Sequence, residues 1–484
     1  MDKTYFISQS TSLTLIIVIS LIFAILGLYH SKKYQGLNNY LTANRNIGLF
    51  SLTTSLTASA LGAWILFGPA SAATWGGIGA IIGYSLGTAF PMFFLIHLGK
   101  KIRKEFPGGS SLIEFMRKKF GKSLFKLILL MTIFYMFIFL CAEVTAVAVL
   151  INYISGTELW ITALVVLLST LAYTLYGGLK ASIFTDNIQM VVIGVLLLIS
   201  FVYINSFTGS QFSFDFVREK NPHLLSSSYI PSYTAGLTFF IAVAATNLFH
   251  QGNWQRVFAA KNNLILKKSL IYSSIITLLI VLWMGYTGLI SFSLNSKVIP
   301  DLAFFDLILS KNFLLIISIL VLALALTLST IDTLINAISS ILIVNGNQIS
   351  KSIFGNSLKN KTNYIILLIS ILVFILASKG FSILYLFLLA DLFCCAAVVT
   401  IFYGFFNKKI NTQMSYLSIL SALILGILFF PSMDFQTSLL VGNLLPIESF
   451  SSIITTNLLF ISFAIAVITQ FFFIIIYSLR SSFK

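Results

Sequence analysis

Residues 57–69 read TASALGAWILFGP, within a stretch that is otherwise apolar enough to form a membrane-spanning helix. Small and polar residues replace the leucine and isoleucine of a lipid-facing helix, and Gly62, Gly68 and Pro69 favour an interruption of the helix. Unwound backbone at membrane depth occurs where it lines a cavity or is buried in protein, and its free carbonyl groups can then coordinate a cation. Small residues also serve close helix packing, so both interpretations stay open here.

The composition of the whole chain is that of a membrane protein. Of its 484 residues, 58% are hydrophobic and 9% are charged, whereas a typical soluble domain carries about 25% charged residues. The mean hydropathy is +0.98. About thirteen apolar runs are long enough to cross the bilayer as helices. We therefore expect an all-α polytopic membrane protein in which residues 1–484 form a single transmembrane domain.

The net charge of +16 reflects the orientation of the chain in the membrane. If the N-terminus lies outside and the C-terminus in the cytoplasm, about four fifths of the 30 basic residues face inward, as the positive-inside rule requires. The basic excess then indicates contact with anionic lipids on the cytoplasmic face, and no nucleic-acid partner is expected. We expect a multi-pass protein of the plasma membrane, which in a bacterium is the inner membrane.

A second polar stretch, at residues 326–340, reads LTLSTIDTLINAISS. Ser329, Asp332, Thr333 and Asn336 recur at helical spacing and so form one continuous face. The hydroxyl groups could bond to carbonyls of their own helix, but this does not explain a carboxylate inside an apolar span. Ionisable residues at such depth are functional candidates, and oxygen ligands of this kind suit a hard cation such as sodium.

Other features restrict the possible chemistry. Glu143 and Asp391 are acids inside apolar spans, and His250 lies at a span end beside Gly252; each could also serve only helix packing. The three cysteines lie in apolar runs, so we expect neither a disulfide framework nor a cysteine metal site. The chain has no complete phosphate loop, so an ATP-driven pump is not indicated, and it has no HExxH zinc motif.

Two stretches carry a family resemblance. Residues 172–189, AYTLYGGLKASIFTDNIQ, and 254–261, WQRVFAAK, resemble signatures of the solute:sodium symporter family. The resemblance extends over essentially the whole chain and implies a five-plus-five inverted-repeat (LeuT-like) core with broken first helices. The repeats would span about 48–206 and 233–404, with accessory helices at about 12–30, 412–430 and 455–479. Residues 58–69, 106–115 and 388–392 are most similar to the urea-transporter branch.

The resemblance also implies binding positions. A shared sodium site would use backbone carbonyls of Ala58, Leu61 and Leu326 and hydroxyls of Ser329 and Thr330. A second, deeper site for a cation or a proton would involve Asp186, Ser329, Asp332 and Thr333. Members with that second site have a hydroxyl where this chain has Asp332, and a buried carboxylate can bind sodium or carry a proton. Candidate residues around the solute are Trp64, Glu143, His250 and Asp391.

These features predict a secondary active transporter and not an enzyme. The coupling ion would be Na⁺, with H⁺ as an alternative, and the solute a small polar organic compound, urea or a related nitrogenous compound being the best candidate. A proline or other amino-acid symporter, a membrane solute sensor and a passive channel are further alternatives. Nothing in the sequence requires a protein partner; the expected partners are the solute and the lipid bilayer.

Overall fold

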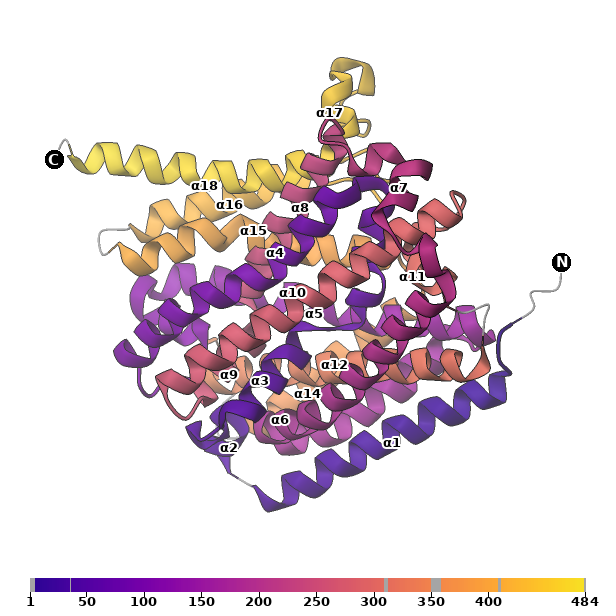
Figure 1. Ribbon diagram of the computed structural model, residues 1–484. Coiled ribbons are helices and arrows are strands. Elements are labelled where there is room, and N and C mark those ends of the chain that lie inside the picture. The colour runs from indigo at the N-terminus through magenta and orange to yellow at the C-terminus, as the bar shows by residue number, and fades with distance from the viewer. Residues whose placement is uncertain (1–4, 35, 309–311, 350–357, 408–410, 483–484) are drawn as a thin grey trace.

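A computed structural model describes residues 5–34, 36–308, 312–349, 358–407 and 411–482. Over these residues the chain is helical, with a few isolated β-bridges and no extended strand. The long helices form one bundle (Figure 1). They are α1 (Gln9–Lys33), α3 (Leu49–Ala60), α4 (Gly68–Glu105), α5 (Leu112–Ser155), α6 (Leu159–Thr208), α8 (Ile230–Phe249), α9 (Gln251–Ala259), α10 (Asn263–Leu294), α12 (Phe313–Ile349), α14 (Leu358–Ala377), α15 (Ile383–Phe406), α16 (Thr412–Phe429) and α18 (Leu458–Ser482).

Eleven helices of the described residues are long and apolar enough to cross a membrane. Large apolar side chains such as Leu21, Leu198 and Leu368 are exposed on the outside of the bundle, which suits contact with hydrocarbon. Polar side chains such as Asp186 and Asp332 are fully buried instead. The chain is therefore inside-out relative to a soluble protein, and the expected all-α polytopic class is confirmed.

The number of single spanning helices differs from the thirteen expected, because helices and membrane crossings do not correspond one to one. The expected spans centred on Val166 and Val195 both lie in α6, whose 50 residues would measure about 75 Å if straight, far more than the bilayer core of about 30 Å. The expected span at Ala60 is divided among α3, the 3₁₀ turn η2 (Ala63–Leu66) and the start of α4. Each piece alone is too short to cross.

Gly178 divides α6 into two helices. Its φ of 57° and ψ of −151° lie in a region that side chains disfavour. Tyr173 and Ser182 both donate hydrogen bonds to the carboxylate of Asp332, although nine residues along a continuous helix would place them about 13 Å apart on opposite faces. The chain must therefore change direction between them. The Gly177–Gly178 pair of the sequence signature is the point at which it does so.

Two helices are broken near the middle of the bundle. α3 ends at Ala60, Gly62 is extended with φ −94° and ψ −174°, and the helix resumes through η2 into α4. α8 ends at Phe249, and His250, with φ −57° and ψ 108°, separates it from α9. These are the first helices of the two expected repeats, so the expected breaks are confirmed. The outer limits of the repeats, 48–206 and 233–404, stay a prediction.

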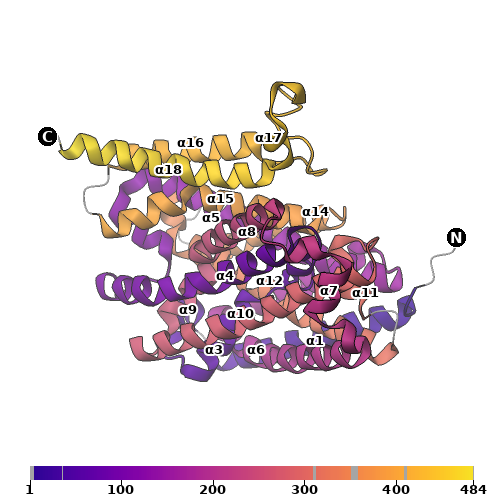
Figure 2. The same ribbon diagram turned by 45° about the horizontal axis from the view of Figure 1, so that its top comes forward.

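The helices pack in an order that surrounds these breaks. α4 contacts α8 and α10, while α12 contacts α6, α3 and η2. α1 packs on α6, and α16 packs on α18. In both views α16 and α18 lie on the side of the bundle away from α1 (Figures 1 and 2). The N- and C-termini lie at opposite ends of the long helices, as an odd number of crossings requires.

Orientation in the membrane can be tested with single cysteines. Ser123 of α5 and Ser227, which precedes α8, are exposed, and the native Cys141, Cys394 and Cys395 are buried. In a chain lacking these cysteines, we expect Ser123→Cys to react with an impermeant thiol reagent only from the cytoplasm and Ser227→Cys only from outside. Labelling of whole cells against inverted vesicles provides the measurement. Labelling of both positions from the same side would contradict the assignment.

Candidate functional site

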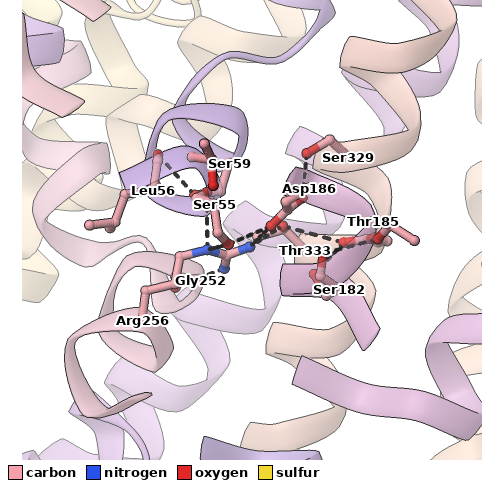
Figure 3. A network of polar contacts seen from close by, with 12 residues as sticks. Ser55, Leu56, Ser59, Ser182, Thr185, Asp186, Gly252, Arg256, Ser329 and Thr333 are labelled. Atoms are coloured by element: carbon pink, nitrogen blue, oxygen red, sulfur yellow. Dashed lines mark hydrogen bonds and ion pairs between the residues drawn. The ribbon is translucent and has the colours of Figure 1, made fainter. Parts of the chain in front are cut away.

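Buried polar side chains gather where α12 packs against α3, η2, α6 and α9. Asp186, on α6, is fully buried and accepts hydrogen bonds on both carboxylate oxygens. Ser329 Oγ donates to Oδ1 at 2.7 Å. Ser55 Oγ donates to Oδ2 at 2.5 Å, and Arg256 Nη2 donates to the same oxygen at 2.7 Å. One carboxylate therefore joins residues from α3, α9 and α12 (Figure 3).

Asp332, on α12, has a separate set of partners. Tyr173 Oη and Thr185 Oγ1 donate to Oδ2 at 2.8 and 3.1 Å, and Ser182 Oγ donates to Oδ1 at 2.6 Å. All three donors come from α6, on both sides of its break. The next residue, Thr333, accepts a hydrogen bond from Arg256 Nη2 at 2.9 Å. The four residues expected at the deeper ion site thus lie in one network, and Arg256 contacts two of them.

The residues expected at the shared sodium site lie on two helices of this network, Ala58 and Leu61 at the C-terminal end of α3 and Leu326, Ser329 and Thr330 on α12. Among the described residues, no backbone N–H donates to the carbonyls of Ala58 or Leu61, as expected at the end of an interrupted helix. Ser329 uses its proton toward Asp186, which leaves its oxygen lone pairs available for a cation. Thr330 Oγ1 donates to the Leu326 carbonyl at 3.1 Å. Backbone and hydroxyl oxygens with a carboxylate behind them suit a hard monovalent cation.

Glu143 stabilises the break in the first broken helix. Its Oε2 accepts a hydrogen bond from the backbone N–H of Ala63 at 2.8 Å, the first residue of η2. A Cβ on Gly62 would overlap Oε1 of Glu143, so only glycine fits between the carboxylate and the backbone. Glu143 is absent from the residues that line the central cavity. The structure therefore places it behind the broken helix, and its expected contact with solute stays a prediction.

The central cavity lies between the two broken helices and contains the other three candidate solute residues. Trp64, His250 and Asp391 line it, and its volume is about 40 Å³. Asp391 Oδ1 accepts a hydrogen bond from Thr246 Oγ1 at 2.6 Å. Nδ1 of His250 is buried and has no partner among the described residues. The remaining lining residues include aromatic rings and polar side chains, namely Ser59, Tyr84, Phe139, Thr246, Asn247 and Phe387.

Several functional candidates were missed by sequence reasoning. Arg256 was identified only as part of the WQRVFAAK signature, and Tyr84 was not identified at all. Tyr84 stacks on Trp64 with ring centroids 5.4 Å apart and so fixes the orientation of that ring. A charge inside the membrane requires a partner, but the burial of Arg256 and its pairing with Asp186 appear only in the folded chain. No local pattern in the sequence could have linked the two residues.

The fit between Gly62 and Glu143 predicts a local sensitivity to substitution. Gly62→Ala should destabilise the protein by about 1–3 kcal/mol, because the added methyl group displaces the carboxylate or the backbone. The measurement is thermal unfolding of the purified protein in detergent. Gly194→Ala is the matched control, because a Cβ at Gly194 meets no atom within 4 Å. Equal melting temperatures for the two variants would contradict this role of Gly62.

Comparison with known proteins identifies the family. A profile of the sodium:solute symporter family matches residues 40–426. The chain is 27% identical over 384 residues to the protein named spermidine transporter DUR31 of Candida albicans, an alignment that covers 78% of this chain and 71% of that protein. The urea branch is not supported by this name and stays a prediction from sequence motifs.

Solved structures share the fold. A Na⁺-coupled sialic acid symporter aligns with a TM-score of 0.69 at 16% identity, covering 95% of this chain and 96% of that chain. MhsT in complex with L-phenylalanine aligns with a TM-score of 0.55 at 15% identity, covering 89% and 98%. The inverted-repeat architecture inferred from sequence is thereby confirmed. Because the family profile matches most of its length, this chain belongs to the sodium:solute symporter family and is a multi-pass membrane transporter of a small-molecule solute, not an enzyme.

Proposed function

We propose that this protein is a symporter that uses sodium entry to accumulate a small nitrogenous solute, with urea as the first candidate. The observation that carries the proposal is the position of Asp186. Its carboxylate accepts hydrogen bonds from Ser55 of α3 and Ser329 of α12. These two helices, with Leu61 directly after α3, contain all five oxygen ligands of the expected sodium site. A cation there would join the interrupted end of α3 to α12.

Ion and solute would be coupled through the same broken helix. The expected sodium ligands Ala58 and Leu61 lie at the end of α3, and Trp64 of the solute cavity follows three residues after Leu61. Ion binding that orders this segment therefore also positions Trp64 in the wall of the central cavity. By thermodynamic linkage, a solute that binds better to the ordered segment must tighten ion binding by the same factor.

The cavity favours a very small solute with N–H donors. A volume of about 40 Å³ corresponds to about three or four water-sized groups, since one water needs roughly 10–15 Å³ by this measure. Asp391 supplies a carboxylate acceptor, and no lysine or arginine lines the cavity within the described residues. Urea meets both conditions, because its N–H groups need acceptors and it is compact.

A protonated amine is the second candidate. The lining combines Asp391 with the rings of Trp64, Tyr84, Phe139 and Phe387, and carboxylates and aromatic faces both attract ammonium groups. The similarity to a protein named as a spermidine transporter points the same way. A polyamine is much longer than the cavity in this structure, so it would require a wider state of the protein.

Uptake by the purified protein in proteoliposomes tests the function directly. Labelled urea, spermidine and proline would each be offered under an imposed sodium gradient, an imposed proton gradient or no gradient. We expect concentrative uptake of urea that requires sodium. Concentrative uptake of spermidine or proline alone would replace urea as the solute, and proton-driven uptake without sodium would replace the coupling ion. Flux that is independent of both gradients would identify a channel. Solute binding without flux would identify a sensor.

Removal of the site's hydroxyls predicts a change in sodium dependence. Ser329→Ala and Thr330→Ala should each raise the half-saturating sodium concentration at least about tenfold, because a ligand to a charged group contributes roughly 1.5–3 kcal/mol. Ser318→Ala is the matched control: its exposed hydroxyl bonds only to the Leu314 carbonyl of its own helix, and the sodium dependence should be unchanged. Normal sodium dependence in both site variants at equal surface expression would exclude this location for the ion.

A further inference from the structure

A groove on the outer surface of the bundle lies between α6 and α14, which pack on each other. Its volume is about 590 Å³. Along α6 its lining extends from Leu168 to Tyr176, and along α14 from Leu367 back to Lys359. Leucines therefore occupy one end of the groove and polar side chains the other. Leu168 and Leu367 are 57% and 42% exposed, so the apolar end faces hydrocarbon. This division into an apolar and a polar end matches the chemistry of a lipid.

A smaller hollow continues the polar end of the groove. Its volume is about 240 Å³, and it shares Tyr176 and Lys359 with the groove. Tyr34, directly after α1, and Tyr40 of the short helix α2 (Leu37–Thr42) also line it. A hollow of this size accommodates a phosphate with its glycerol headgroup, since one water-sized group needs roughly 10–15 Å³. Acyl chains and a headgroup therefore have separate places in the groove and the hollow.

Three lysines place positive charge around this hollow. Lys359 Nζ lies 5.3 Å from the ring centre of Tyr40. Lys33 Nζ and Lys180 Nζ lie 5.8 and 5.1 Å from that of Tyr34. The aromatic faces attract these ammonium groups and favour their positions. Among the described residues, no carboxylate forms an ion pair with any of the three. Their charge is therefore available to an anion from outside the protein.

Asn363 adds an unsatisfied hydrogen-bonding atom at the polar end of the groove. Its Oδ1 is buried and has no partner in the part of the chain that the structure describes. A buried acceptor without a donor is costly, and a hydroxyl group of a lipid headgroup can supply the donor. A headgroup ammonium could also donate, but the three lysines would repel it. The polar end therefore favours a phosphate that carries hydroxyl groups.

We propose that the groove and the hollow together bind one anionic phospholipid with a hydroxylated headgroup, such as phosphatidylglycerol, at the end of the bundle expected to face the cytoplasm. Basic pockets between membrane helices bind lipids of this charge. The site shares no residue with the ion and solute positions, so the inference does not rest on the proposed transport function. Gly177 also lines the hollow, so the bound lipid would contact the point at which α6 changes direction.

Lipid binding to the delipidated full-length protein, followed by native mass spectrometry, tests the site. We expect dioleoyl phosphatidylglycerol to bind at least about tenfold more tightly than dioleoyl phosphatidylethanolamine, because the lysines attract net negative charge. Lys359→Gln should weaken phosphatidylglycerol binding about fivefold, and Lys180→Gln/Lys359→Gln about twentyfold, as expected for single basic residues near an anionic lipid. Lys268→Gln is the matched control: this exposed lysine of α10 lines neither the groove nor the hollow, and binding should be unchanged.

Ala172→Trp tests the acyl groove with every lysine in place. Ala172 lines the groove and is exposed, so the larger side chain should fill the space of the acyl chains without disturbing the fold. We expect weaker binding of phosphatidylglycerol to this variant and a melting temperature equal to that of the lipid-free wild type. Inorganic phosphate, added as a soluble anion, should not displace the lipid.

Several results would overturn the inference. Equal affinity of the wild type for the two lipids would exclude an anionic site, and so would wild-type binding by Lys359→Gln. Unchanged binding by Ala172→Trp would exclude the groove as the place of the acyl chains. Displacement of the lipid by inorganic phosphate would identify a site for a soluble anion instead. The comparison of the two lipids on the wild type decides even if a variant fails to fold.

Discussion

The architecture of this protein depends on placing charged groups inside a bilayer. Asp186 and Arg256 can be buried there only because each compensates the other and the remaining oxygens and N–H groups have partners. Satisfying those partners draws α3, α6, α9 and α12 to one point in the bundle. The Asp186–Arg256 pair lies beside both helix breaks. Ser55, which donates a hydrogen bond to Asp186, precedes the first break, and Arg256 follows the second. An electrostatic requirement therefore organises the part of the fold around both breaks.

The breaks provide the chemistry that regular helices lack. Interrupting α3 frees carbonyl groups for a cation, and Glu143 on α5 takes the backbone N–H of Ala63 on the far side of the break. The broken segment is thus held on one side by the Glu143 carboxylate, and the proposed sodium ion would bind on the other side. Trp64, in the same short segment, faces the solute cavity. In the proposed function, ion and solute would therefore bind to one short segment, through which each could affect the binding of the other.

Much of this could be predicted from the sequence, because hydrophobic runs and interrupted spans are local signals. The polytopic class, the break near Gly62 and the polar face of Ser329 and Asp332 all follow from neighbouring residues. The partners of Asp332 do not, since Tyr173 and Ser182 reach it only after the chain reverses at Gly178. Arg256 illustrates the same limit: its motif was visible, but its pairing with a carboxylate 70 residues earlier depends on tertiary packing.

The central claim is that one ion and one solute order the same broken helix, and reciprocal binding tests it most directly. The dissociation constant of sodium would be measured with and without saturating solute, using urea or spermidine, whichever the vesicles accumulate. The dissociation constant of that solute would be measured with and without saturating sodium. The account predicts that each ligand tightens the other by the same factor, well above one. Sodium and solute affinities that are independent of each other would contradict it.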